Sequence, residues 1–263
     1  MDGKKPTKIA IVNTPLLDRL KEEMDMSLKG GIYHITQIQL CYNSNRIEGS
    51  KLSLDQTRYI YETNTVDSEK GKVLNVDDIV ETINHFSCFR YLLKTAKESL
   101  NEFIIKEYHR ILKTGTYDSQ KDWFNVGEYK KRENMVGDIE TTLPEHVSEE
   151  MHVLLENYRQ KSIHTACTIE DIITFHHNFE SIHPFQDGNG RVGRLIMFKE
   201  CLKNNVIPFI IDEEHKLYYY RGLKEYKKTP GYLIDTCLSA QDSYKEYLYY
   251  YKISFAENSS IEN

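Results

Sequence analysis

Cysteine is scarce in this 263-residue sequence, and its distribution excludes a disulfide-linked framework. The five cysteines are odd in number, widely separated and without any C-x-x-C pair, which is typical of reduced thiols in a cytosolic protein. Long apolar runs are also missing; the longest are short, such as Ile207 to Ile211, which contains Pro208. The sequence therefore predicts no membrane-spanning segment. The basic N-terminus is not followed by an apolar stretch of signal-peptide length, so we expect a cytoplasmic protein.

The sequence also lacks an excess of basic charge. The formal net charge is −6, whereas a general nucleic-acid binder normally presents a basic field. We therefore expect no nucleic-acid partner. Apolar residues make up 40% of the chain and charged residues 28%, which is typical of a soluble globular protein. The sequence shows no internal repeat, low-complexity tract or long linker that would separate two domains.

Helical periodicity dominates what is present. A capping box at Ser53–Gln56 predicts one helix start, Thr168 with Asp171 predicts a second, and Asn101 predicts another. Between Thr116 and Pro144 the helical period disappears, and glycines punctuate short segments with β character. These patterns predict an all-α fold with a short β-hairpin flap, compact as a whole. We expect three parts: N-terminal helices over 1–75, a catalytic core over 76–230 and a C-terminal helix over 231–263.

The most informative segment is HPFQDGNGRVGR, from His183 to Arg194. His183 precedes Pro184, which ends a helix, so His183 can project from the helix end as a general base near neutral pH. Asp187 follows in a turn, where a carboxylate beside a phosphate site commonly holds Mg²⁺. The structural alternatives are a packed histidine and a turn aspartate that accepts backbone N–H groups.

Glycines and arginines complete this segment. Gly188 and Gly190 flank Asn189, so backbone amides there can converge on an anion at the start of the next helix. Arg191 and Arg194 lie three residues apart on one face of that helix. Cations are unfavourable at a helix N-terminus, so bound oxyanions or carboxylates from elsewhere must offset them. The set fits phosphoryl or nucleotidyl transfer, in which catalysis depends on positioning and on stabilising charge on oxygen atoms.

This segment matches, at every specified position, the signature of the Fic-domain family, and the resemblance extends over roughly residues 40 to 230. The resemblance implies a largely helical protein adenylyltransferase that transfers AMP from ATP, with Mg²⁺ or Mn²⁺, to a Ser, Thr or Tyr hydroxyl of a target protein or of itself. It implies that His183 deprotonates the hydroxyl, that Asp187 binds the metal, and that Asn189 with the Gly188 and Gly190 amides holds phosphate oxygens. Arg191 would bind the β-phosphate and Arg194 the γ-phosphate.

The resemblance also implies a flap that aligns an extended segment of the target protein by strand addition. It comprises Lys130, Lys131, Arg132, Glu133, Asn134, Met135, Val136, Gly137 and Asp138.

A second motif, Ser44 to Gly49 (SNRIEG), resembles the inhibitory motif of the same family in the group that carries it N-terminal to the catalytic motif. The resemblance implies that Glu48 pairs with Arg194 and occupies the guanidinium that would otherwise hold the γ-phosphate, with Ser44 and Gly49 completing the motif. The alternative is an ordinary solvated helix end.

Two other functions stay open at this point. One is a hydrolase that removes AMP at the same site, with Glu48 positioning a water molecule. The other is a catalytically silent module that binds ATP, although pure binding needs no base such as His183. The sequence also leaves open whether the molecule is a monomer or a homodimer.

Overall fold

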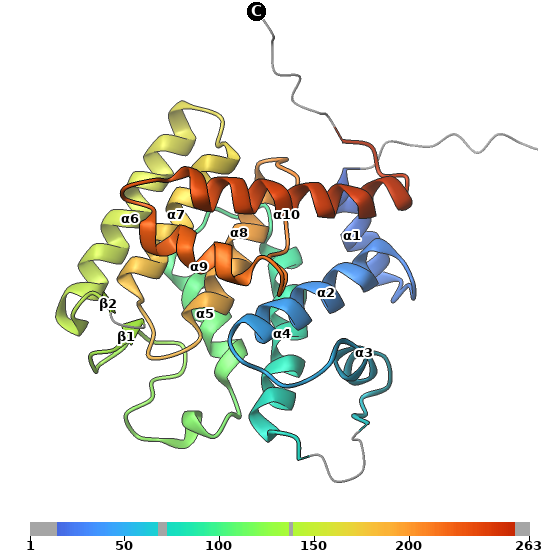
Figure 1. Cartoon of the computed structure of the whole chain (residues 1–263), viewed down its shortest axis with the longest axis horizontal. Helices are drawn as coiled ribbons and strands as arrows, with labels where there is room; N and C mark the ends of the chain where they lie inside the picture. Colours follow the sequence, from blue (N-terminus) through green and yellow to red (C-terminus); the bar gives the residue numbers. More distant parts are fainter. Residues whose placement is uncertain (1–14, 68–72, 137–138, 256–263) are drawn as a thin grey trace, which may run out of the picture.

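The computed structural model describes residues 15–67, 73–136 and 139–255, and the regular secondary structure of these residues is almost entirely helical (Figure 1). The α-helices are α1 (Leu16–Asp25), α2 (Ile32–Ile47), α3 (Leu54–Thr63), α4 (Val76–Thr95), α5 (Glu102–Lys113), α6 (Pro144–His164), α7 (Ile169–Ile182), α8 (Asn189–Lys203), α9 (Lys216–Glu225) and α10 (Gly231–Tyr250). The expectation of a helical fold is therefore confirmed.

Helix starts occur where the sequence supplies capping side chains. Ser53 and Gln56 bond each other's backbone N–H groups at the start of α3, and Thr168 and Asp171 do the same at the start of α7. The Asn101 side chain accepts a hydrogen bond from the backbone N–H of Ile104 at the start of α5. Because each contact satisfies an N–H that the helix itself leaves unpaired, the helix begins at a defined residue. All three predicted caps are confirmed.

Two short strands interrupt the helices between α5 and α6. β1 (Met135–Val136) pairs antiparallel with β2 (Ile139–Glu140), and Met135 lies opposite Glu140. These strands fall in the segment for which we predicted a flap. The expected flap residues Gly137 and Asp138 lie outside the described residues.

Helix α8 is buried almost all round, because other helices surround it. The Phe198 ring packs edge-on against Phe89 of α4 at 5.6 Å and against Tyr244 of α10 at 5.9 Å. Val192 and Leu195 are fully buried in the same core. Since α8 is held from several directions, the orientation of its first turn, which carries the arginines of the motif, is fixed by the core.

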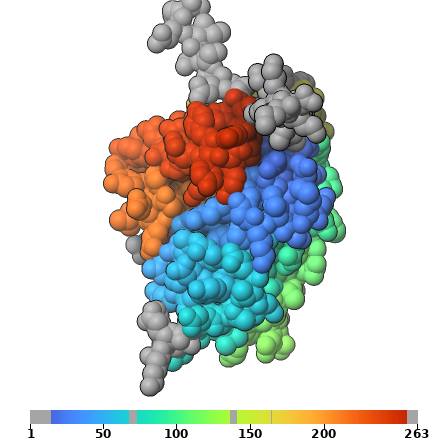
Figure 2. Space-filling view, turned by 90° about the vertical axis from the view of Figure 1, so that its right-hand side faces the viewer, coloured from blue at the N-terminus to red at the C-terminus, as the bar shows by residue number. Residues whose placement is uncertain are grey.

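The N-terminal and C-terminal helices pack on each other. The Thr36 hydroxyl of α2 and the Tyr244 hydroxyl of α10 are 2.8 Å apart, and Figure 2 shows the N-terminal helices in blue directly beside α10 in red. Ile47, at the end of α2, packs in one apolar cluster with Met197 of α8 and Tyr219 of α9. The residues that follow Ile47 therefore lie close to α8.

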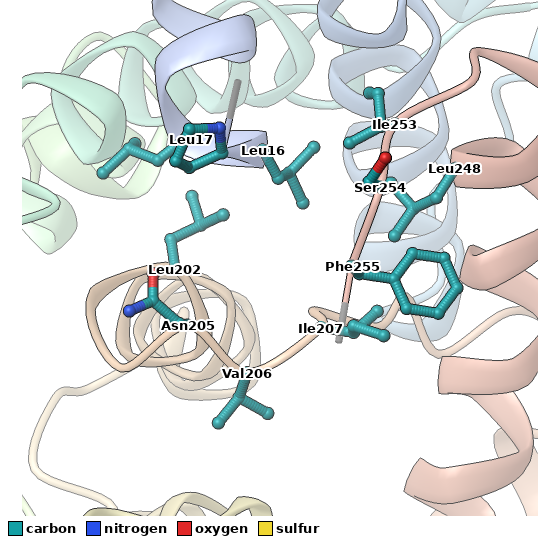
Figure 3. Close-up of a pocket in the computed structure, with 11 residues that line it drawn as sticks. Leu16, Leu17, Leu202, Asn205, Val206, Ile207, Leu248, Ile253, Ser254 and Phe255 are labelled. Atoms are coloured by element: carbon teal, nitrogen blue, oxygen red, sulfur yellow. The ribbon is translucent and has the colours of Figure 1, made fainter. Parts of the chain in front are cut away.

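A hollow with a volume of about 400 Å³ lies at the C-terminal end of α8 (Figure 3). Its wall includes Leu16 and Leu17 of α1, Leu202 of α8 and Leu248 of α10. The motif arginines occupy the opposite, N-terminal end of α8. This apolar hollow is therefore separate from the charged site described below. Among the described residues, no helix combines the length and the apolar character needed to cross a lipid bilayer.

Candidate active site

The turn between α7 and α8 brings the predicted site residues together. His183 ends α7 in the left-handed conformation, with φ of 52°, and its backbone N–H bonds the Phe179 carbonyl at 2.9 Å. Pro184 follows and prevents the helix from continuing, as predicted. Gly188, with φ of 83°, then precedes α8. A side chain at this φ would be strained, so glycine allows the sharp entry into the helix.

The Asn189 side chain closes this turn. Its Oδ1 accepts the Phe185 backbone N–H and its Nδ2 donates to the Phe185 carbonyl, both at 2.8 Å. Phe185 is fully buried and stacks on His109, with the ring centroids 4.1 Å apart. We expected the Asn189 side chain to hold phosphate oxygens, but in this structure both of its polar atoms bond the backbone. Its observed role is to shape the turn that presents the neighbouring amides.

His183 is held neutral by its surroundings. Burial, reinforced by the nearby Lys130 ammonium, lowers the pKa of His183 to about 4. Its Nδ1 is buried and faces back toward α7, where a Glu180 carboxyl oxygen lies 4.0 Å away. An imidazole with this pKa is unprotonated at physiological pH and therefore has a nitrogen free to accept a proton.

Asp187 belongs to a closed cluster of two cations and two anions. Its Oδ2 accepts a hydrogen bond from the Lys113 ammonium at 2.6 Å and pairs with the Arg191 guanidinium at 3.3 Å. Glu81 of α4 binds both of those cations through its two carboxylate oxygens. Burial alone would raise the pKa of Asp187, but Arg191 and Lys113 hold it well below its usual range. Asp187 is therefore ionised under all ordinary conditions.

The Asp187 carboxylate fits the expected metal ion. Its side chain is 48% exposed, and both ion pairs use the Oδ2 oxygen, so the group retains capacity for another ligand. The described residues contain no cluster of three or more side chains that could enclose a metal. Mg²⁺ commonly binds through one or two carboxylates while phosphates and water supply the rest of its shell. A single open carboxylate beside an anion site suits that mode of binding.

The buried guanidinium of Arg194 binds the end of α2. It donates to the Glu48 carboxylate at 2.6 Å, to the Ser44 hydroxyl at 2.9 Å and to the Ser44 carbonyl at 2.9 Å. The Glu48 carboxylate also lies directly over Gly190, where even a methyl group would collide with it. Gly49, with φ of 99°, then turns the chain away from the site. The predicted Ser44 and Glu48 thus converge on the predicted phosphate-binding Arg194, and Gly49 follows them at the turn.

Helix α9 and the turn before it also bind the same end of α2. The Tyr220 hydroxyl donates to the Ile47 carbonyl at 3.1 Å, and Arg46 pairs with Glu213 just before α9 at 3.0 Å. Neither contact involves Glu48 itself, so the end of α2 has its own attachment to the rest of the protein.

The segment expected to form the flap is anchored beneath the turn. The Lys130 backbone N–H bonds the Pro184 carbonyl at 2.8 Å, and its ammonium donates to Asn134 and Thr141 at 2.7 and 2.6 Å. The Asn134 side chain donates to the Phe185 carbonyl at 2.9 Å. Lys130 and Asn134 therefore connect this segment to the turn that carries His183.

The remaining flap residues differ in how well the structure describes them. The exposed ones are Lys131, Arg132, Glu133 and Met135. The Val136 side chain lies outside the described part of the structure. The described part of this segment thus combines an anchored base with an exposed tip.

Sequence reasoning missed four side chains of the site: Glu81, His109, Lys113 and Glu180. His109 receives a hydrogen bond from the Gly127 N–H at its Nδ1 and contacts the Asp187 carbonyl through its Nε2 at 3.2 Å. All four lie within ordinary helical patterns, so no local signal distinguishes them from packing or surface residues. Only the packing of α4, α5 and α7 against the motif shows their role.

The Fic/DOC family model matches residues 99–201. The chain is also similar to a protein adenylyltransferase Fic from Nematostella vectensis, with 26% identity over 231 residues, which is 83% of this chain and 52% of that protein. It is 28% identical over 187 residues to protein adenylyltransferase fic-1 from Caenorhabditis elegans, covering 69% of this chain and 35% of that protein. The chain therefore spans about half or less of the length of these relatives.

Solved structures share the fold. A Fic domain containing signaling protein from Bacteroides thetaiotaomicron has a TM-score of 0.69 and 21% identity, over 92% of this chain and 99% of that one. Fic-1 from C. elegans has a TM-score of 0.69 and 23% identity, over 90% of this chain and 72% of that one. The family match therefore identifies a Fic/DOC family domain over residues 99–201, and these solved structures share the fold of the chain.

Proposed function

We propose that this chain is a protein adenylyltransferase, which transfers AMP from ATP to a hydroxyl group of a protein. The observation that carries the proposal is the turn between α7 and α8, with a neutral histidine at one end and the anion-binding residues at the other. His183 lies at the end of α7, and Arg191 and Arg194 lie in the first two turns of α8. The names of the similar proteins support the same activity.

In the proposed reaction, the oxygen of the target hydroxyl attacks the α-phosphorus of ATP. The bond from the α-phosphorus to the bridging oxygen breaks, pyrophosphate leaves, and the hydroxyl proton moves to Nε2 of His183. Amides at the start of α8, around Gly188 and Gly190, are oriented to stabilise charge on phosphate oxygens. Arg191 and Arg194 orient the β- and γ-phosphates, for which a planar guanidinium is suited.

A metal ion held by Asp187 would neutralise charge on the leaving pyrophosphate. Without ligand, internal carboxylates occupy the phosphate-binding cations: Glu81 binds Arg191, and Glu48 binds Arg194. The energy of ATP binding must therefore compensate for the loss of these ion pairs.

The Glu48–Arg194 contact supports autoinhibition as part of this proposal. One guanidinium cannot bind a carboxylate and the γ-phosphate at the same oxygen-binding edge, so Glu48 competes with the productive position of ATP. Glu48 also covers Gly190, whose amide lies at the start of the anion-binding helix. The protein would then be active only when the end of α2 moves or when Glu48 is removed.

Labelled ATP tests the proposed reaction. The Glu48→Gly variant should become labelled when incubated with Mg²⁺ and ATP that carries the label on its α-phosphate, and should stay unlabelled when the label is on the γ-phosphate. That pair of results separates AMP transfer from phosphorylation. Label that appears and then disappears would favour the hydrolase alternative, and binding of ATP without any label would favour the silent binding module.

Substitution of Asp187, the proposed metal ligand, should cause a large loss of activity. Asp187→Ala should abolish most transfer at any Mg²⁺ concentration, because the charge of the pyrophosphate leaving group is then not neutralised. The exposed Asp122, replaced by alanine, is a matched control that should behave as wild type. Transfer that persists in excess EDTA would contradict a role for the metal.

The proposal also covers the target segment, the location, the oligomeric state and the division of the chain into parts. Residues 130–138 would align an extended segment of the target next to His183, with a Ser, Thr or Tyr hydroxyl as acceptor, and the protein itself can serve as a target. A cytoplasmic location, a homodimeric state and the division into parts at 1–75, 76–230 and 231–263 also remain predictions.

A further inference from the structure

Glu180 is a buried titratable group to which the proposed mechanism gives no role. It lies one turn before His183 on α7, and its side chain is 13% exposed. Its Oε1 has no hydrogen-bond partner. A buried polar atom without a partner is costly, so its presence calls for a physical reason.

The carboxyl group of Glu180 lies between two histidines. Its Oε2 is 4.0 Å from Nδ1 of His183, and its Oε1 is 4.0 Å from Nδ1 of His176. The other nitrogen of His176 contacts the Tyr219 hydroxyl at 2.6 Å. Gly193 of α8 makes room for the carboxyl group, because a Cβ at that position would lie 2.6 Å from Oε1. The neighbouring elements thus hold Glu180 against the inner side of the His183 ring.

Charged and titratable groups from three other parts of the structure face this carboxyl group. Arg194 faces it from α8, Glu48 from the end of α2, and Tyr219 and Tyr220 from α9. Burial, with a smaller contribution from Glu48, raises the pKa of Glu180 to about 8, against the opposing effect of Arg194. Glu180 is therefore mostly uncharged at neutral pH and becomes an anion as the pH rises through about 8.

We propose that Glu180 is a positioning residue for His183: its carboxyl group faces Nδ1 and, once ionised, balances the positive charge that forms when Nε2 accepts a proton. The inference rests on the proposed function. No proton passes to Glu180 in this step; the target hydroxyl loses its proton to Nε2, and the Nδ1 proton stays on the ring. The effect of Glu180 is electrostatic, as expected for two groups 4.0 Å apart in a buried site.

The pH dependence of transfer follows from this arrangement. Above a pH of about 8, Glu180 carries a negative charge, which stabilises the imidazolium and makes His183 a stronger base. The rate of transfer should therefore rise with pH through this range. Glu180→Gln keeps the shape of the side chain but cannot ionise, so its profile should lack this rise.

The experiment uses the full chain carrying Glu48→Gly, so that transfer can be measured. Because Glu48 contributes to the raised pKa of Glu180, the rise in rate should begin at a lower pH in this parent. Adding Glu180→Gln should lower the rate about 10- to 100-fold at high pH, with a smaller loss at neutral pH. The expected loss is smaller than the ~10⁴-fold loss found where a carboxylate bonds the catalytic histidine directly. Glu180→Asp should restore the pH-dependent rise in part. The control is Glu170→Gln, which changes an exposed position of the same helix.

Nitrogen NMR of the His183 ring provides a readout that does not require activity. The nitrogen shifts of the neutral ring should change as the pH rises through about 8 and the neighbouring Glu180 carboxyl group ionises, and Glu180→Gln should abolish that change. An unchanged ring spectrum, or a Glu180→Gln profile parallel to that of its parent, would overturn the inference while leaving adenylyl transfer intact. Absence of transfer in all variants would instead overturn the proposed function, and the ring spectra would still decide the role of Glu180.

Discussion

Replacing His183 by alanine is expected to lower the rate of AMP transfer by a factor of about 10²–10⁴ while leaving ATP affinity nearly unchanged. The loss is that of a positioned general base. His183 makes no ion pair with the phosphate-binding arginines, so its removal leaves the anion site in place. Labelling with α-labelled ATP measures the rate, and calorimetric titration measures the affinity.

The backbone conformation of His183 requires a second variant. With φ of 52°, this position favours residues that tolerate the left-handed region, and asparagine does so more readily than alanine. His183→Asn should therefore fold at least as well as His183→Ala and lose transfer to the same extent. His152→Ala, at an exposed position of α6, is the matched control. Near-normal labelling by either His183 variant would exclude His183 as the base.

Replacing Glu48 by glycine is expected to raise auto-modification about 10- to 100-fold. A hydrogen bond to a charged group contributes about 1.5–3 kcal/mol, and each 1.4 kcal/mol corresponds to a factor of ten. The Glu48 carboxylate is 30% exposed, and it holds Arg194 at 2.6 Å. Its removal frees that guanidinium for the γ-phosphate, so the gain should appear in the rate rather than in a large change of ATP affinity.

Two further variants show whether the gain comes from Arg194. Arg194→Ala should be inactive, and adding Glu48→Gly to it should not restore activity, because the γ-phosphate then has no guanidinium to bind. Glu214→Gly removes an exposed glutamate from a turn and serves as the control. A Glu48→Gly variant no more active than wild type on any target, including itself, would make Glu48 an ordinary helix end.

The local structure around the motif was predictable. His183 followed by Pro184 predicted the end of α7, and the capping residues at Ser53 and Thr168 predicted the starts of α3 and α7. These predictions succeed because each depends on residues at most four positions apart. The pairing of Glu48 with Arg194 was also expected, though only through the resemblance of residues 44–49 to a known motif.

The partners of the charged residues were not predictable in the same way. Arg191 binds Glu81, which lies 110 positions earlier, and Asp187 binds Lys113, 74 positions earlier. Nothing in α4 or α5 marks these residues, because a glutamate or lysine in a helix is usually a solvated surface residue. The bonding partner of the Asn189 side chain was not predictable for another reason. The motif indicates an anion site, but only the folded turn shows that both polar atoms of this side chain bond the backbone of Phe185.

The sequence by itself thus determined the helical class, the helix starts and the turn that gathers His183, Asp187 and the two arginines. Periodicity, caps, proline and glycine act between near neighbours, so their effects can be read along the chain. Only the tertiary structure decided the electrostatic state of the site. Burial and the nearby Lys130 ammonium keep His183 neutral, Glu81 and Lys113 close the ion cluster at Asp187, and Glu180 faces the candidate base. Charge interactions and desolvation depend on distance in space, and helix packing sets those distances.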